Sequence, residues 1–350
     1  MVRKSNFELL RIISMMMIIG LHYFHSEMGG AIGQQKPNEL NFYITYFLEG
    51  LFHTSVNCYI LITGYFMANK KEVSISKVFN ILLMMIFFGF VFFSISILMG
   101  WQTFSWLGLF KGLFPIFFGL KWFILVYIIL YLLTPFINAG LTNFTKKGMM
   151  IYLIIYLFFF SIWPSFLPGA PNSDLGYGII NFVLMYSIGF YIRNHYRNDK
   201  HKKYIYLLGF FGCGLLTFFA KILVTYFDIE FINVWSYDYI FIVLGSVLLF
   251  LCFSKVNIQS NAINYIAKFT LAVYFFHVDP SILNFLYRDF LNTNEFWHST
   301  LYLPHLLISV LITYLIGTIF GIIQNWIFNK IKVNNNNISS IFNFKISPRR

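Results

Sequence analysis

The chain has few charged residues, few cysteines and no long polar loop, and each shortage excludes a class of protein. Asp, Glu, Lys and Arg make up 11% of the 350 residues, whereas soluble domains contain about 25%. Hydrophobic residues reach 58%, and the mean hydropathy is +0.70. These values exclude a soluble globular protein and predict an integral membrane protein. No loop between the apolar segments exceeds about twenty residues, so we expect any chemistry to take place within the apolar bundle.

The three cysteines lie within apolar segments and lack the spacing of a metal site. We therefore expect Cys58, Cys213 and Cys252 to be reduced packing residues, and we expect no metal site and no permanently bound cofactor. The first apolar segment is followed by no small-residue cleavage site and by many further apolar segments. We expect an uncleaved first helix and not a signal peptide.

Apolar segments of spanning length recur along the whole chain and predict an all-α, polytopic bundle of about ten transmembrane helices. The stretch 101–119 is aromatic and interrupted by Gly and Pro, which predicts an interfacial or re-entrant segment. Residues 1–328 would form the transmembrane domain, and 329–350 a basic, Asn-rich cytoplasmic tail without fixed structure. The predicted spans are 7–25, 43–66, 78–100, 120–139, 149–163, 178–193, 203–226, 236–254, 268–287 and 301–323.

Basic residues set the expected orientation of these spans. The net charge is +12, but Lys and Arg alternate with apolar segments instead of forming one patch, so we expect membrane lipid and no nucleic acid as a partner. With the N-terminus in the cytoplasm, 20 of the 25 Lys and Arg residues fall on the cytoplasmic side. This split predicts that both termini are cytoplasmic and that the loop 168–174 is external.

Arg11 and His22 lie eleven residues apart on the first apolar segment. Eleven steps of 100° return to within about 20° of the starting direction, so both side chains share one helix face about 16 Å apart along the axis. Ionisable residues inside a spanning helix are costly and by default indicate a functional site. Alternatively, Arg11 extends to the headgroups and His22 bonds a neighbouring helix.

Three further groups of residues are candidates for substrate binding. His277 and Asp279 lie in an apolar segment beside Pro280, which suggests a widened, water-lined site; alternatively, Asp279 pairs with Arg288 or Lys268. The second and third groups also have ordinary interpretations, as helix packing with a cationic rim and as an aromatic belt. Their members are Thr63, Gly64, Tyr65, Lys70 and Lys71 near the end of the second span, and Trp122 and Tyr127 in the fourth.

Taken in order, these segments resemble the membrane acyltransferase-3 family, the integral membrane O-acyltransferases of bacterial surface polysaccharides. Arg11 and His22 have the family's Arg-x10-His spacing. Residues 57–66 (NCYILITGYF) are similar to its apolar Ser-Gly-Tyr/Phe signature, with Thr63 where Ser is common. The segments 122–138 (WFILVYIILYLLTPFIN) and 270–277 (TLAVYFFH, with Tyr274 and His277) are similar to its Trp-Phe…Tyr-Leu…Pro and Leu-x-x-Tyr-Leu-x-His segments. The Arg-rich stretch that usually follows the second span is here only KKEVSISK.

The resemblance implies an enzyme of the bacterial plasma membrane that transfers an acyl group, acetyl above all, from cytoplasmic acyl-CoA to a hydroxyl of a cell-surface or lipid-linked glycan. His22 would be the general base or a transient acyl carrier. Arg11 would clamp the donor phosphates, orient the thioester or stabilise the oxyanion. Lys70 and Lys71 would attract the phosphates, and His277 would form pocket wall or contact the acceptor.

Two other classes share the apolar spans and the basic loops. A glycan exporter or polymerase is one, although polymerases usually need a large external loop, which is missing here. A proton-coupled transporter using His22, His277 and Asp279 as a relay is the other. The sequence has no paired broken helices in corresponding halves, which disfavours this transporter.

Overall fold

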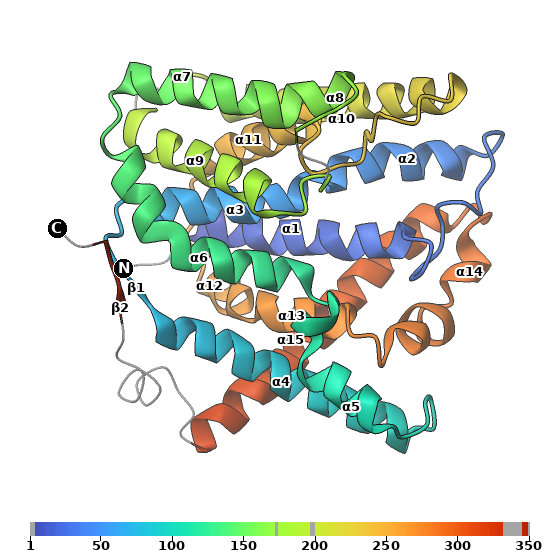
Figure 1. Cartoon of the computed structure of the whole chain (residues 1–350). Helices are drawn as coiled ribbons and strands as arrows, with labels where there is room; N and C mark the ends of the chain where they lie inside the picture. Colours follow the sequence, from blue (N-terminus) through green and yellow to red (C-terminus); the bar gives the residue numbers. More distant parts are fainter. Residues whose placement is uncertain (1–3, 172–173, 197–199, 332–344, 349–350) are drawn as a thin grey trace.

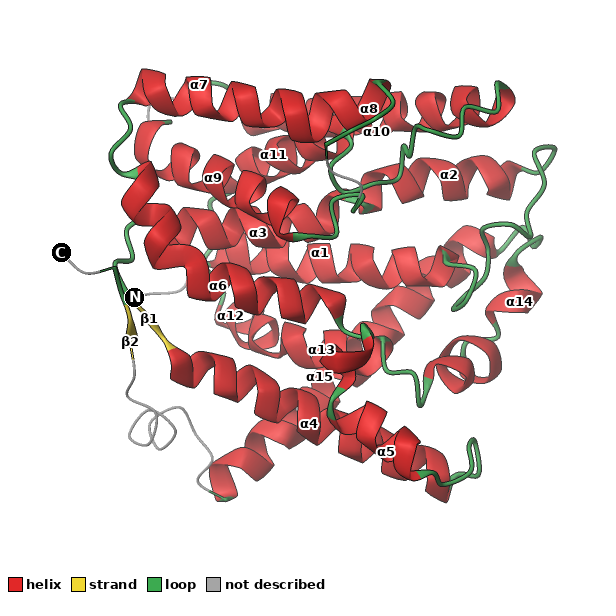
Figure 2. Ribbon diagram, viewed as in Figure 1, coloured by secondary structure: helices red, strands yellow, loops and turns green. Residues whose placement is uncertain are grey.

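The structure is a computed structural model that describes residues 4–171, 174–196, 200–331 and 345–348. Figure 2 shows helices throughout, with one short pair of strands at one end of the bundle. The predicted all-α bundle is therefore nearly correct, and the strands are its only departure within the described residues.

Helix α1 (Ser5–Phe24) runs through the centre of the bundle (Figure 1). It packs against α3, α11, α13 and α15. In its most apolar 18-residue stretch 72% of the residues are buried, against 22% in that of the peripheral α10 (Lys203–Tyr226). A membrane helix that faces protein on all sides can carry polar side chains, because its neighbours supply their partners. This position explains how the first span holds Glu8, Arg11 and His22.

The second apolar segment is split at His53 into α2 (Leu40–Phe52) and α3 (Thr54–Met67). Helix α3 packs closely against α9 (Ile179–His195). A Cβ atom at Gly64 would collide with the backbone carbonyl oxygen of Tyr186, and one at Gly189 would collide with that of Leu61. Glycine at these positions lets the two backbones approach.

The stretch 101–119 folds back along the preceding helix. After α4 (Ile75–Leu98), the short α5 (Trp106–Leu113) lies against α4, where the backbones of Gly89 and Gly112 are in close contact. A 3-10 turn, η1 (Pro115–Phe118), then leads into α6 (Trp122–Leu141). The chain thereby returns to the interior of the bundle at Lys121, which is buried.

The middle of the chain forms the outer helices on one side of the bundle. Helix α7 (Lys146–Leu157) continues through a π-helical turn, η2 (Phe158–Ile162), into α8 (Trp163–Phe166), so this apolar run is longer than the predicted 149–163. Helix α11 (Ile240–Ser254) packs against α10 and α3.

The predicted ninth span, 268–287, is wrong as a continuous helix. The chain forms α12 (Asn261–Ile266), a 3-10 turn η3 (Ala267–Phe269) and α13 (Thr270–His277), and then leaves the helix at Val278. Asp279 and Pro280 lie in the turn that follows, because proline disfavours the helical conformation in the residue before it. A π-helical turn, η4 (Phe285–Phe290), and α14 (Thr293–Phe296) complete the segment.

The last helix is longer than predicted, since α15 runs from Tyr302 to Lys330. The predicted tail lies largely outside the described residues, but β2 (Lys345–Ile346) pairs antiparallel with β1 (Val73–Ser74). Lys345 Nζ also lies 2.7 Å from Glu72 Oε1. This part of the chain therefore contacts the connection between α3 and α4.

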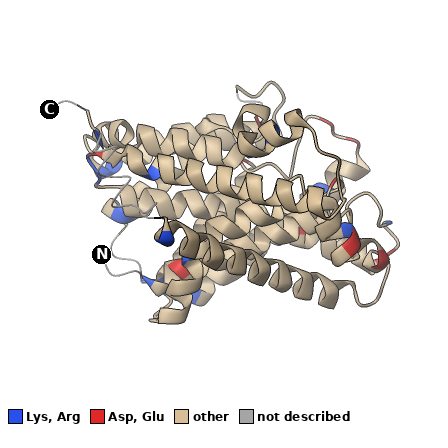
Figure 3. Cartoon of the chain, turned by 90° about the horizontal axis from the view of Figure 1, so that it is seen from below, with Lys and Arg blue, Asp and Glu red and all other residues tan. Residues whose placement is uncertain are grey.

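Six helical segments are long and apolar enough to cross a membrane, judged by length and composition within the described residues. The protein is a multi-pass membrane protein, while the count of ten spans stays a prediction. Figure 3 shows that Lys and Arg gather at the end of the bundle that carries β1 and β2, whereas Asp and Glu lie mainly at the opposite end. The six segments are Ser5–Phe24, Ile75–Leu98, Trp122–Leu141, Lys146–Phe166, Lys203–Tyr226 and Tyr302–Lys330.

Candidate active site in the central cavity

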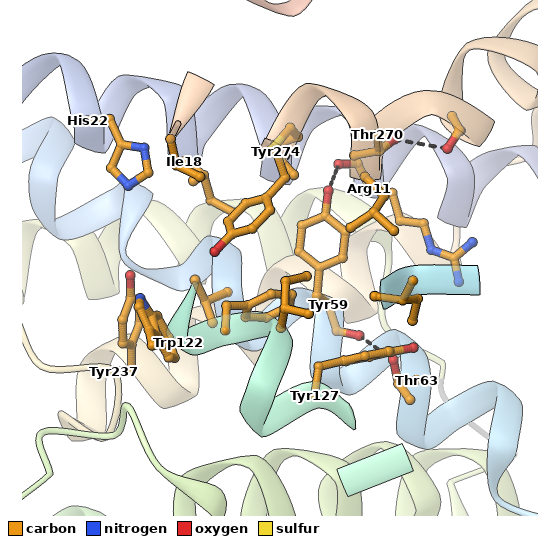
Figure 4. Close-up of a pocket in the computed structure, with 18 of the residues that line it drawn as sticks. Arg11, Ile18, His22, Tyr59, Thr63, Trp122, Tyr127, Tyr237, Thr270 and Tyr274 are labelled. Carbon is orange, nitrogen blue, oxygen red and sulfur yellow. Dashed lines mark hydrogen bonds between the residues drawn. The ribbon is translucent and has the colours of Figure 1, made fainter. Parts of the chain in front are cut away.

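A cavity of about 420 Å³ lies beside α1, between α3, α4, α6 and α13. Helix α1 lines it with a single stripe of side chains spaced by three, four and seven residues. Both Arg11 and His22 belong to this stripe, as their shared helix face predicts. Figure 4 shows His22 at one end of the cavity and Arg11 at the other. The lining residues from α1 are Arg11, Met15, Ile18 and His22.

The Arg11 end carries two cationic side chains. Arg11 Nη1 lies 3.0 Å from Glu8 Oε1, and the Arg11 side chain remains 34% exposed. Lys268, an exposed residue of η3, lines the same cavity. The hydroxyl of Tyr59 donates to the Arg11 carbonyl oxygen at 2.6 Å and ties α3 to α1 here. This end therefore combines positive charge with access from outside the bundle.

The His22 end is aromatic and half-buried. His22 lies across the cavity from Trp122 and Tyr237 (Figure 4). Its Nδ1 is buried and has no hydrogen-bond partner among the described residues. The ring of His277 lies behind it, 5.0 Å away between ring centroids.

Other predicted residues from three helices also line this cavity. Thr63 comes from α3, Trp122 and Tyr127 from α6, and Tyr274 from α13. The Thr63 hydroxyl donates to the Tyr59 carbonyl oxygen at 2.9 Å, so its proton is committed to its own helix. The structure therefore brings Arg11, His22, Thr63, Trp122, Tyr127 and Tyr274 together.

The remaining predicted residues lie outside the cavity. Gly64 packs on α9, and Tyr65 accepts a hydrogen bond from Arg193 Nη1 at 3.3 Å beside a separate pocket. Lys70 and Lys71 line another open pocket near Asn138 and Ser347. The structure thus separates this lysine pair from Arg11, and the role of the pair as a donor contact stays a prediction.

Asp279 has a different partner from those predicted. Its Oδ2 lies 3.7 Å from Lys121 Nζ, which also donates to the Val278 carbonyl oxygen at 2.9 Å. Both side chains are almost fully buried, at 2% and 5% exposure. Arg288 instead stacks on Trp297, and Lys268 lies over Tyr265. In the sequence, Lys121 could have been noticed as a single lysine at the start of the predicted apolar span 120–139.

Sequence reasoning also missed four polar residues of the cavity lining. Tyr59 could have been found, since it precedes Thr63 by one helical turn and shares its face. Tyr237 and Lys268 come from distant segments that carry no local motif, and Thr270 is the first residue of the segment 270–277. No group of three metal-binding side chains occurs within the described residues.

Comparison with known families identifies the family of the chain. A family model described as an acyltransferase domain matches residues 4–330. This chain belongs to the acyltransferase-3 family. The match covers every helix that lines the cavity. The acyltransferase domain therefore includes the whole bundle around Arg11 and His22. No curated protein and no solved structure matches the chain significantly.

Proposed function

We propose that this acyltransferase moves an acyl group, acetyl above all, from acyl-CoA to a hydroxyl of a cell-surface or lipid-linked glycan. The observation that carries the proposal is one cavity with cations at an accessible end and a half-buried histidine, whose Nδ1 is buried and unpartnered among the described residues, at the other. A donor with a long phosphate-bearing arm and a small reactive thioester matches such a cavity. The cations would hold the phosphates while the thioester reaches His22.

The donor phosphates bind at the Arg11 end in this proposal. Arginine presents a planar fork that matches phosphate oxygens, and lysine adds a mobile point charge. Glu8 already holds the Arg11 side chain in place. The helical rise separates Arg11 from His22 by about 16 Å, so an extended donor spans the gap and the two side chains need not touch.

His22 acts as the general base in the transfer. It accepts the proton of the acceptor hydroxyl while that oxygen attacks the thioester carbonyl carbon. The new C–O bond forms, the C–S bond breaks, and the proton passes to the departing thiolate sulfur. The products are the acylated glycan and free CoA, so atoms and charges balance without any further reactant.

The acceptor approaches along an aromatic surface at the His22 end. Trp122 and Tyr237 line the cavity, with ring centroids 5.7 Å apart. Tyr177, which is 40% exposed, lies 4.6 Å from Trp122 and 4.9 Å from Tyr237. Tyr and Trp rings present an apolar face with a polar tip, which suits a sugar that has both kinds of surface.

The orientation that serves this chemistry places the Arg11 end in the cytoplasm, where acyl-CoA is available, in a bacterial plasma membrane. Support comes from the 20-to-5 division of basic residues and from their concentration at one end of the bundle. Both termini are then cytoplasmic, and the His22 end lies toward the outer face.

Membranes with and without the chain test the proposal when supplied with acetyl-CoA labelled in its acetyl group. We expect label to appear in the glycan or lipid-linked saccharide fraction only when the chain is present, together with release of CoA. Transport of saccharide without covalent label would contradict acyl transfer and favour an exporter.

A further inference from the structure

The tautomer of His277 is fixed by its own helix. Its Nδ1 lies 2.7 Å from the carbonyl oxygen of Val273, four residues earlier. A carbonyl oxygen can only accept, so Nδ1 carries the hydrogen and the neutral ring keeps a lone pair at Nε2. This Nε2 is buried and has no hydrogen-bond partner among the described residues.

The position of His277 in the bundle indicates which group can donate a hydrogen bond to the lone pair of Nε2. His277 is fully buried and does not line the cavity, whereas His22 does. The two rings are 5.0 Å apart and tilted by 37°. Nδ1 of His22 is likewise buried without a partner in the described part of the chain. The neighbouring rings of His22 and His277 therefore each have one ring nitrogen without a partner among the described residues, and that of His277, Nε2, is an acceptor.

We propose that His277 is a positioning residue that sets the tautomer of His22. Its Nε2 accepts a hydrogen bond from Nδ1–H of His22, which leaves the lone pair of His22 at Nε2, the nitrogen that remains for the substrate. A general base works best when a third group orients it in this way. The inference rests on the proposed function only for the identity of the proton that His22 takes.

During transfer, Nε2 of His22 binds the proton of the acceptor hydroxyl, and the ring becomes an imidazolium. The bond from Nδ1–H to His277 stabilises this cation, and the proton then leaves Nε2 for the thiolate sulfur of CoA. His277 keeps its own proton throughout. Catalytic hydrogen bonds are often long before substrate binds and tighten in the complex, which fits rings that lie adjacent without a direct bond among the described contacts.

Charged and titratable groups from the neighbouring elements surround the pair. His25 follows directly after the end of α1, Lys121 precedes α6, and Tyr274 lies on α13, with its ring 6.1 Å from that of His277. Lys121 is paired with Asp279, with 3.7 Å between Nζ and Oδ2, so the carboxylate offsets its charge.

The direct test reads the tautomer of His22 by nitrogen-15 NMR. The full chain, labelled at histidine and held in lipid nanodiscs, is measured at pH 8, above the ordinary histidine pKa of about 6.5. The His22 signals are identified by their loss in His22→Gln. We expect the Nδ1–H tautomer in the native protein and a change to the Nε2–H tautomer in His277→Phe. The Nε2–H tautomer in the native protein, or no change in His277→Phe, would overturn the inference.

His53→Phe is a matched control, because His53 is also buried and its Nδ1 also bonds a carbonyl four residues earlier, that of Glu49 at 2.9 Å. Its ring faces Tyr237 and not His22. The tautomer of His22 should stay unchanged in this variant. His277→Gln is the second test variant, since its amide oxygen can still accept and should retain part of the native tautomer if the phenylalanine variant does not fold.

Turnover separates the inference from the proposed function. With acetyl-CoA as the donor in membranes, we expect His277→Phe to lower kcat by about 10- to 100-fold, by analogy with the loss of the hydrogen-bond partner of a metal-bound histidine, with KM for acetyl-CoA unchanged. His277→Gln should recover part of this loss. A tautomer change without any acetyl transfer by the native chain would refute the proposed function alone; transfer that His277→Phe leaves intact would refute the inference alone.

Discussion

The two ends of the central cavity differ in charge and in access, although α1 supplies a functional side chain to each. At one end Arg11 is partly exposed, paired with Glu8 and accompanied by Lys268. At the other, His22 is surrounded by Trp122, Tyr237 and the buried His277. One helix thus joins an accessible cationic site to an aromatic site suited to proton chemistry.

This difference assigns separate tasks to the two ends. Charged groups that meet solvent can attract a charged ligand without a large desolvation cost. A histidine that must take and return a proton is better placed where water is scarce, because every electrostatic interaction is stronger there. We therefore expect variants at the Arg11 end to change donor binding, and variants at the His22 end to change turnover.

The sharpest contrast concerns which end of the cavity faces the cytoplasm. Ser347 lies at the end that carries β2, and Thr300 lies in the loop before α15 at the other end. Each of the two is replaced by cysteine in a separate variant, Ser347→Cys and Thr300→Cys. A membrane-impermeant maleimide should label Thr300→Cys in intact cells and Ser347→Cys only after permeabilisation. The parent chain controls for Cys58, Cys213 and Cys252, which are free and buried. The reverse pattern would place the donor end outside the cell and refute the orientation.

Loss of the base should have the largest effect on turnover. We expect His22→Ala to lower acetyl transfer by about 10²–10⁴-fold, the usual contribution of a general base, while expression and membrane insertion stay normal. Alanine inserts into a membrane helix more easily than histidine, so insertion cost cannot explain the loss. His25→Ala, three residues further on and exposed, should remain active. Activity of His22→Ala close to that of the native chain would refute the mechanism.

The next largest effect concerns the shape of the cation at the donor end. Arg11→Lys keeps the charge but loses the planar fork. Hydrogen bonds to charged groups contribute about 1.5–3 kcal/mol, so we expect KM for acetyl-CoA to rise by about tenfold or more. Arg193→Lys is the control, since Arg193 faces a separate pocket beside Tyr65. An unchanged KM in Arg11→Lys, or a lower kcat alone, would remove Arg11 from phosphate binding.

A smaller effect decides between two lysine sites for the donor. Lys268→Gln removes one solvent-exposed charge from the cavity, and a few-fold rise in KM is expected, since exposed charge pairs contribute about 0.2–1 kcal/mol. The double variant Lys70→Glu, Lys71→Glu should weaken donor use less, because its pocket is separate. If the double variant has the larger effect on KM, the phosphates bind at the Lys70 side instead.

The sequence predicted the parts of this site that depend on helix periodicity. The eleven-residue spacing of Arg11 and His22 places both on one cavity wall, because a helix face is a local property of the chain. The same periodicity could have identified Tyr59. The broken ninth span was harder, because its hydropathy continues through Asp279 and Pro280 although the helix ends at His277.

Tertiary partners could not be predicted in the same way. Lys121 precedes α6 and Asp279 follows α13, so the two residues are far apart in the sequence. Neither segment carries a pattern that predicts the other as its partner. Lys268 enters the cavity because η3 packs on α1, and Tyr237 enters it because the segment before α11 bonds to Asn57 of α3. The 5.0 Å approach of His22 and His277 likewise depends on the packing of α13 against α1.

The smallest expected effect concerns Thr63, which lies toward the Arg11 end of the cavity in Figure 4. Its hydroxyl donates to the Tyr59 carbonyl oxygen within α3, and serine can make the same bond. Thr63→Ser removes one methyl group, worth about 0.8 kcal/mol when buried, so both kcat and KM should stay within about twofold of the native values. Thr63→Val keeps the shape without the hydroxyl and should also stay active. If valine abolishes transfer while serine supports it, the hydroxyl contacts the reacting groups, and the chemistry extends beyond the His22 end.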